Sequence, residues 1–313
     1  MIQRFSEDLS RQEIYAHGVE LAQKLGVDRD EKGNRVYTWP KDKKVLVHTF
    51  ANPVLATDDF RIAQIKPCIK RYTVNALFQS PLKITEYKNM SLEFEQGKYP
   101  GVWGPSIDTL LFCRAMNNID LSSFRNAVEV GSGSGFLSKY VLKNADNLEN
   151  ITLVDLNEYS ARCASRNFDN KGIIDTRTEF ITGNAIEYLE ENPGHDLVIC
   201  NPPYIPRPKS IDDNPYEGVD LLVYLIKNAK NYLNPGGSLI TNISSLCADI
   251  AQKGFAEAGS RFNHLDKMEV PLKVLNVLNN KEWMRYLRRK GLRKETRQGH
   301  DYWQTINIVE VKP

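Results

Sequence analysis

The sequence predicts an α/β protein with a doubly wound, mostly parallel sheet, and three observations lead to this fold class. From residue 106 onward, short apolar runs alternate with segments of helical spacing, as strands and crossover helices do. The runs at 127–130 and 196–200 are largely apolar, which is typical of strands buried on both faces. A glycine-rich turn at 131–135 joins the first of these runs to a helical segment.

The first hundred residues show a weaker pattern. Apolar residues at helical spacing predict a helix over 12–25, and the polar segment 28–44 is expected to be a loop. Beyond them, we expect a strand at 44–48, a second helix at 63–78 and a hairpin at 82–94.

The remaining chain is regular enough to assign each element. Helices are expected over 108–116, 136–144, 158–168, 185–190, 221–233 and 248–258, and strands over 127–130, 151–154, 179–181, 196–200, 238–243 and 303–311. The change of pattern divides the chain into three parts. We expect an accessory, substrate-recognition domain at 1–80, a linking hairpin at 81–105 and the α/β domain at 106–313.

Charge and cysteine content narrow the class of protein. Forty-one basic and thirty-nine acidic side chains give a net charge of +2, which excludes a chain that binds nucleic acid by bulk charge alone. The five cysteines are odd in number and widely spaced, so we expect reduced thiols and a cytoplasmic protein. The sequence contains no apolar run of about eighteen residues, so we expect no membrane span. The five histidines show no metal-ligand spacing, so we expect no metal site.

The turn after the 127–130 strand carries glycines at three alternate positions, two residues after an acid. Glycine lets a ligand lie against bare backbone, and the free N–H groups at the start of the next helix favour an anion. A nicotinamide-binding turn would need its third glycine at position 136, which is Phe136. The spacing instead resembles the S-adenosylmethionine (SAM) turn of class I methyltransferases. We therefore expect Glu129, Gly131, Gly133 and Gly135 to hold SAM.

Two polar residues follow the next two strands. Asp155 ends its strand twenty residues after Gly135, where a carboxylate can accept hydrogen bonds from both hydroxyls of a ribose. The alternative for Asp155 is a helix cap or an exposed loop acid. Asn184 can accept from the amino group of adenine through its side-chain oxygen, and the alternative is an ordinary helix cap.

The tetrapeptide Asn201-Pro202-Pro203-Tyr204 directly follows the 196–200 strand. Adjacent prolines end the strand and stiffen the loop, so the Asn201 side-chain oxygen and the Pro202 carbonyl become two fixed acceptors for one planar –NH2 group. Such acceptors stabilise positive charge that develops on the nitrogen during methylation, and Tyr204 can stack on the flat acceptor. The alternative is a proline-rich strand exit with a packed tyrosine.

With both motifs in place, residues 86–243 resemble the release-factor glutamine N-methyltransferase family. The likeness includes the glycine turn, the tetrapeptide and the segment 216–222, which is similar to the family's helix entry after the catalytic loop. The resemblance implies a Rossmann-like, seven-stranded class I methyltransferase sheet with a smaller N-terminal substrate or lid domain, and SAM as the cofactor. It also implies that Pro105 and Thr109, in a segment that lacks the family's usual arginine, border the SAM pocket.

The resemblance implies methylation of an amide or amino nitrogen without naming the acceptor. A protein glutamine, as in release factors, a nucleic-acid base and a small molecule all stay open, the last with residues 1–80 as a lid. A non-catalytic SAM-binding scaffold is the remaining alternative. The basic segment 281–300 either offers a surface for an anionic partner or forms an amphipathic helix whose Trp283 and Leu287 pack on the core.

Overall fold

The computed structural model describes residues 26–29, 35–38, 45–48, 82–88, 90–94 and 99. It also describes the chain from 101 onward, except for 169–175, 212–217, 298–299 and four residues between 273 and 279. The described chain divides into two compact units. One comprises residues 1–110 with 294–302, and the other comprises 111–293 with 303–313. Each unit is considered by itself.

The first unit contains two small sheets. β1 (Gly26–Arg29) pairs antiparallel with β2 (Arg35–Thr38), and β4 (Leu82–Tyr87) pairs in parallel with β3 (Val45–His48) and antiparallel with β5 (Met90–Phe94). The predicted strand at 44–48 and the hairpin at 82–94 are confirmed. The prediction of a loop over 28–44 is wrong at 28–29 and 35–38, where β1 and β2 pair in spite of the polar composition of this segment. The predicted helices at 12–25 and 63–78 lie outside the described residues.

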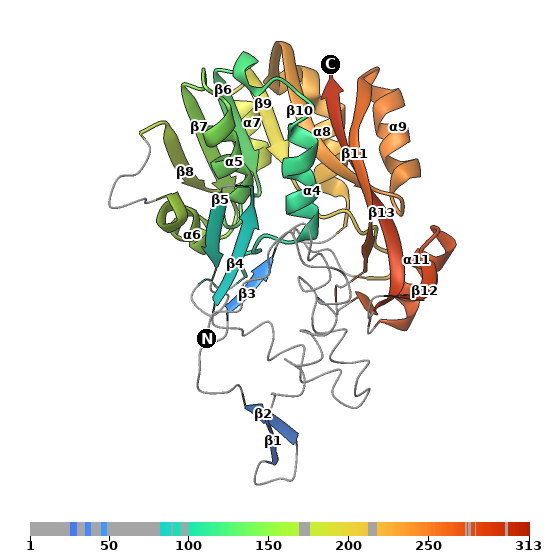
Figure 1. Ribbon diagram of the computed structural model, residues 1–313. Helices are drawn as coiled ribbons and strands as arrows, with labels where there is room; N and C mark the ends of the chain where they lie inside the picture. The colour runs from blue at the N-terminus through green and yellow to red at the C-terminus, as the bar shows by residue number, and fades with distance from the viewer. Residues whose placement is uncertain are drawn as a thin grey trace. The chain divides into compact units, whose positions relative to one another are not determined.

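The second unit is built on a large sheet whose strands lie in the order β11-β13-β10-β9-β6-β7-β8 (Figure 1). β12, which pairs with β13, falls almost entirely in the first unit. The bounds of these strands are β6 Asn126–Val130, β7 Asn150–Asp155, β8 Thr178–Thr182, β9 His195–Cys200, β10 Leu233–Ser244, β11 Arg261–Pro271, β12 Arg293–Arg297 and β13 His300–Lys312. The strands from β8 to β10 run parallel, whereas β13 is antiparallel to both β10 and β11. The predicted doubly wound, mostly parallel sheet is thus confirmed.

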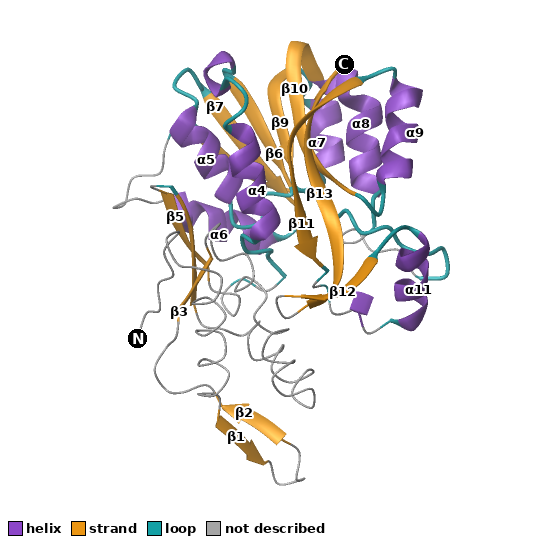
Figure 2. Ribbon diagram, turned by 45° about the vertical axis from the view of Figure 1, so that its right-hand side comes forward, coloured by secondary structure: helices purple, strands orange, loops and turns teal. Residues whose placement is uncertain are grey.

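Helices cover both faces of this sheet. Figure 2 shows α5 (Phe136–Asn144) and α6 (Glu158–Phe168) over one face, and α7 (Ala185–Glu191), α8 (Asp220–Tyr232) and α9 (Ala248–Ala258) over the other. On the second face, Val128, Val198 and Cys200 of the strands pack with Leu225 and Ile226 of α8. These helices, and α4 (Ile107–Met116), begin and end within one residue of their predicted bounds.

The C-terminal part contains two strands that the sequence did not predict. β11 is an edge strand with mostly exposed or half-buried residues, and its charged side chains hide the apolar alternation that marks a strand. β12 consists almost entirely of charged residues. Between them, α11 (Lys281–Arg289) buries Trp283, Met284 and Leu287, so the prediction of an amphipathic helix is confirmed.

The strand order brings the two sequence motifs together. From β6 the chain first builds β7 and β8 on one side and then returns to add β9 and β10 on the other. Val130, the last residue of β6, lies opposite Cys200, the last residue of β9. The glycine turn and the tetrapeptide therefore leave adjacent strands at the same carboxyl edge, where open α/β sheets bind their ligands.

Candidate functional site

The glycine turn has a backbone that side chains would disturb. Gly131, Gly133 and Gly135 have φ angles of 68°, 50° and 77°, in the left-handed region that favours glycine. A Cβ atom at Gly135 would lie 2.8 Å from the ring of Phe168 and 2.9 Å from the Cβ of Ala164, so this glycine is required by close packing of the turn on α6. A Cβ at Gly131 would meet no atom within 4 Å. At Gly131, the turn exposes bare backbone to open space.

Asp155 is joined to this turn directly. One carboxylate oxygen, Oδ2, accepts from the backbone N–H of Gly133 at 2.8 Å, and Oδ1 accepts from the backbone N–H of Asn157 at 2.9 Å. Each carboxylate oxygen can accept more than one hydrogen bond, so both can still receive a hydroxyl group. The structure thus brings Asp155 and the glycine turn together, as a ribose site requires, and the ribose contact itself stays a prediction.

Glu129 has a different environment. Its side chain is 3 % exposed, and Oε2 accepts from the backbone N–H of Ser138 at 2.9 Å and from the Ser138 hydroxyl. Burial raises the pKa of Glu129 to about 8, and the hydrogen bonds from Ser138 offset part of that rise. This carboxyl group ties β6 to the first turn of α5, and its predicted contact with SAM stays a prediction.

Asn184 is the N-cap of α7. Its side-chain oxygen accepts from the backbone N–H of Ile186 at 3.0 Å, and its Nδ2 donates to Glu187 at 3.0 Å. The structure therefore shows the capping role, one of the two alternatives that the sequence left open. An amide oxygen has a second lone pair, so the predicted adenine contact is compatible with the cap.

Thr109 and Pro105 belong to the first unit, at the start of α4. Thr109 Oγ1 accepts from the backbone N–H of Ser106 at 3.2 Å, and the Thr109 N–H donates to Asp108 Oδ1 at 3.1 Å. Pro105, Asp108 and Thr109 are buried. These contacts form the entry to α4, and the expected position of Pro105 and Thr109 beside the cofactor stays a prediction.

The tetrapeptide begins one residue after β9. Cys200, which ends that strand, is paired with Val130 on one side and with Thr241 of β10 on the other. Asn201 is half-buried, and its side-chain oxygen accepts a hydrogen bond from Nδ2 of Asn242, the residue that follows Thr241. Pro202 is buried, and Pro203 and Tyr204 are half-buried. The structure thus fixes the Asn201 amide between the carboxyl ends of β6 and β10.

A distant helix supports the loop that carries the tetrapeptide. The indole N–H of Trp283 on α11 donates to the backbone oxygen of Pro206 at 2.9 Å, and the Ser210 hydroxyl donates to Glu282. Trp283 is 3 % exposed. Asn280 caps the helix by accepting from two backbone N–H groups at 3.0 Å. The apolar side of α11 therefore packs on the segment just beyond the tetrapeptide.

Sequence reasoning missed two residues at this edge. Asn242 lies in the predicted strand 238–243 but received no role, although an amide in the middle of a buried strand is itself a signal. Leu156, directly after Asp155, is 47 % exposed, which is unusual for a large apolar side chain in the described chain. Its position beside the predicted ribose site makes it a candidate surface for a purine ring.

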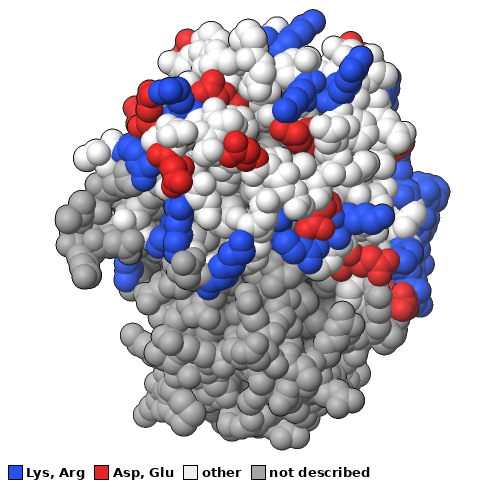
Figure 3. All heavy atoms as spheres, turned by 45° about the horizontal axis from the view of Figure 1, so that its top comes forward, with Lys and Arg blue, Asp and Glu red and all other residues white. Residues whose placement is uncertain are grey.

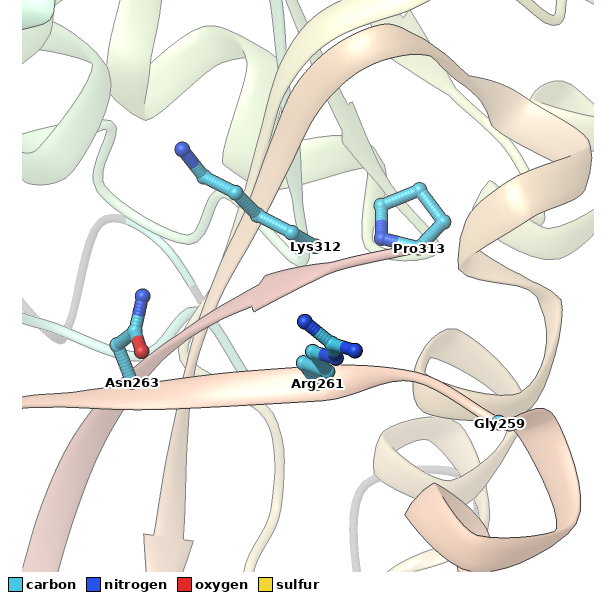
Figure 4. A pocket seen from close by; sticks show the side chains of 5 residues that line it. All are labelled: Gly259, Arg261, Asn263, Lys312 and Pro313. Carbon is cyan, nitrogen blue, oxygen red and sulfur yellow. The ribbon is translucent and has the colours of Figure 1, made fainter.

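A hollow of about 600 Å³ lies elsewhere and is not this site (Figure 4). It is lined by Gly259, Arg261, Asn263, Lys312 and Pro313. Because β13 is antiparallel to β10, its last residues lie at the amino-terminal edge of the parallel strands, opposite to the glycine turn. Among the described residues, no cluster of His, Cys, Asp or Glu could hold a metal ion, and no helix is long and apolar enough to cross a membrane.

Comparison with known proteins gives a consistent result. Residues 106–249 match the methyltransferase small domain family. The chain is 24 % identical over 173 residues to a bifunctional methyltransferase of Rickettsia typhi, a match that covers 51 % of this chain and 33 % of that protein. It is 24 % identical over 153 residues to a release factor glutamine methyltransferase of Rhodopirellula baltica, with 44 % and 50 % covered. It is 29 % identical over 126 residues to ribosomal RNA large subunit methyltransferase G of Shewanella amazonensis, with 40 % and 30 % covered.

These matches cover half or less of the length of the relatives, so they describe the domain that the proteins share. The matched segment contains the glycine turn, Asp155 and the tetrapeptide. The sheet order and the crossover helices agree with a class I methyltransferase fold. Residues 106–249 of this chain match the methyltransferase small domain family, and over this segment the chain is similar to SAM-dependent methyltransferases.

Proposed function

We propose that this protein transfers a methyl group from SAM to the nitrogen of a planar amide or amino group. The observation that carries the proposal is the position of Asn201, which leaves β9 beside the glycine turn that leaves β6. A group that binds the acceptor and a turn that binds the methyl donor thus lie at adjacent strand ends. Such proximity is what a direct transfer between two bound molecules requires.

The proposed donor site uses this chain's backbone and one carboxylate. Gly131 leaves room for the ligand, Asp155 receives the ribose hydroxyls, and Leu156 offers an apolar surface to the purine. Asn184 is proposed to bind the adenine amino group, and Thr109 to border the pocket. When bound, SAM supplies a methyl group attached to a positively charged sulfur.

The tetrapeptide is proposed to prepare the acceptor nitrogen. Asn201 Oδ1 and the Pro202 carbonyl accept hydrogen bonds from the two N–H groups of the –NH2 group, and Tyr204 stacks on its flat face. These acceptors stabilise the positive charge that the nitrogen gains as its bond to the methyl carbon forms and the carbon–sulfur bond breaks. The nitrogen then releases one proton to solvent.

The surface next to the tetrapeptide favours an acceptor in RNA over a protein glutamine. Lys281, Arg285, Arg288 and Arg289 are exposed on α11, and Figure 3 shows basic side chains gathered along the edge where this helix lies. The opposite side of α11 is anchored to the loop after the tetrapeptide through Trp283. Arginine forms paired hydrogen bonds with phosphate oxygens, so this face fits a phosphate backbone close to the acceptor site.

The described cysteines support a reducing compartment such as the cytoplasm. Cys113, Cys163, Cys200 and Cys247 are all free and buried. Burial raises the pKa of the Cys163 and Cys247 thiols to about 12, which keeps them protonated and unreactive.

The test is transfer of labelled methyl groups from SAM to a cell lysate that is then treated with nuclease or with protease. Label that nuclease releases supports an RNA acceptor, and label that protease releases supports a protein glutamine. The variant Asn201→Ala should bind SAM like the wild type and lose at least about 100-fold in transfer rate. SAM binding without any transfer by the wild type would support a non-catalytic scaffold instead.

A further inference from the structure

Asn242 places a polar amide in the interior of the sheet. It lies on β10 among Leu239, Ile240 and Ile243, and its side chain has 0 % exposure. Its backbone is part of the ladder with β13, opposite Ile308. An apolar side chain of the same size would fill this position without bringing a polar group into the core.

The contacts of this amide point to a specific partner. Nδ2 donates to Oδ1 of Asn201, and Oδ1 of Asn242 has no hydrogen-bond partner in the part of the chain that the structure describes. A buried amide oxygen without a partner is unfavourable, so the stability of the sheet gives no reason for an amide here. Its side-chain hydrogen bond goes to the residue that is proposed to bind the acceptor.

The orientation of the Asn201 amide decides whether it can accept a hydrogen bond from the nitrogen that is to be methylated. An acceptor –NH2 group needs an oxygen in front of it, whereas the NH2 end of the Asn201 amide would repel it. The two ends of an amide have nearly the same shape, so packing alone selects poorly between them. In the structure, Nδ2 of Asn242 faces Asn201, and because this group can only donate, this orientation of Asn242 selects the oxygen of Asn201. That oxygen has a second lone pair for the acceptor.

We propose that Asn242 is a positioning residue for methyl transfer, which holds the Asn201 amide with its oxygen available to the acceptor nitrogen. The inference rests on the proposed function of Asn201. It requires no contact between Asn242 and either the donor or the acceptor.

The test uses Asn242→Leu, which keeps the branched shape and removes both polar atoms, and Asn242→Ala, which removes them without adding bulk. Transfer from labelled SAM to the lysate fraction that accepts label in the wild type gives kcat and KM. We expect kcat to fall about tenfold or more in both variants, because the Asn201 amide loses the hydrogen bond that holds it, and it then both flips and rotates away from the position that meets the acceptor nitrogen. The dissociation constant for SAM and the KM for the acceptor fraction should stay within about twofold. The melting temperature of Asn242→Leu should equal or exceed that of the wild type, since the unpartnered oxygen is gone.

Thr241→Val is the matched control. Thr241 is the preceding residue, is equally buried, and has a hydroxyl without a hydrogen-bond partner, but its side chain points to the opposite face of the sheet. Its kcat should equal that of the wild type. A folded Asn242→Leu variant with kcat within twofold of the wild type would overturn the inference, and so would an equal loss in Thr241→Val. A wild type that transfers no label would overturn the proposed function, and this inference with it.

Discussion

Single glycines in the turn after β6 have separable roles. At Gly135, a side chain would meet both a positive φ angle and the atoms of α6, whereas at Gly131 it would meet only the positive φ angle. Gly135 is therefore needed for folding, and Gly131 is needed to give a ligand access to the backbone.

The matched pair Gly135→Ala and Gly131→Ala tests this division. We expect Gly135→Ala to lower the free energy of unfolding by about 2–4 kcal/mol, since overpacking adds to backbone strain. Gly131→Ala should lower it by only about 1 kcal/mol, yet weaken SAM binding more than tenfold if its Cβ enters the donor site. Urea denaturation and calorimetric titration with SAM measure the two effects. Equal losses of stability would contradict the assignment.

Glu129 gives the protein a pH dependence with a defined sign. Its pKa is about 8 in the folded chain and near 4.5 when unfolded, so between these values the folded state holds a proton that the unfolded state has lost. Stability therefore falls as the pH rises from about 4.5 to 8, by about 1.4 kcal/mol per pH unit at most, and levels off above.

The variant Glu129→Gln removes this titration and keeps an oxygen for Ser138. Its stability should depend less on pH between 5.5 and 8 than that of the wild type, as measured by urea denaturation at each pH. Parallel curves for the two proteins would show that Glu129 is ionised in the folded state.

At the scale of elements, α11 joins a basic surface to the loop of the predicted catalytic residues. Its buried side meets Pro206 through Trp283, and its exposed side carries Arg285 and Arg289. A partner that binds the basic face is thus held close to the tetrapeptide, since Asn201 and Pro206 are separated by five residues, which span at most about 18 Å.

The double variant Arg285→Gln/Arg289→Gln tests this surface with a fluorescent single-stranded RNA as the probe. We expect weaker binding and a slope of log K against log salt that is smaller by about 1.4, or about 0.7 for each lost charge. Lys230→Gln/Arg261→Gln, which changes exposed basic residues of α8 and β11, is the matched control and should bind like the wild type. RNA binding that is the same in both double variants would exclude α11 as the contact surface.

The elements that sequence predicted best are those buried on both sides. β6, β7 and β9 are largely apolar and buried, and their patterns leave little choice of structure. β11 escaped prediction because an edge strand needs few apolar residues, and β12 because its five residues are nearly all charged. The strands at 26–29 and 35–38 escaped prediction because they are short and lie in or beside a mostly polar segment.

In the candidate site, too, the residues that could be predicted are those next to recognisable strands. Gly131 to Gly135, Asp155 and Asn201 could be predicted because each lies directly at the end of a recognisable strand. The link between Asn201 and Asn242 could not be predicted, because these residues are 41 positions apart in the chain and their contact depends on the register of β10 against β9. The cap formed by Asn184 was foreseen only as one of two alternatives, since the same amide chemistry serves both.

At the scale of the whole molecule, chain order and spatial order differ on the C-terminal side of the sheet. β13 follows β10 and β11 along the chain but lies between them, antiparallel to both. The ion pair between Arg114, near the end of α4, and Asp266 of β11 further links early and late parts of this unit. These pairings join residues that are distant in sequence, which slows folding.

During synthesis on the ribosome, β10 and β11 therefore emerge before the strand that separates them. Until β13 arrives, one side of β10 offers unpaired backbone groups and apolar side chains to any other nascent chain. The nascent protein should depend on chaperones at this stage, and truncation before β13 should yield an aggregating product even though the glycine turn and tetrapeptide are already complete.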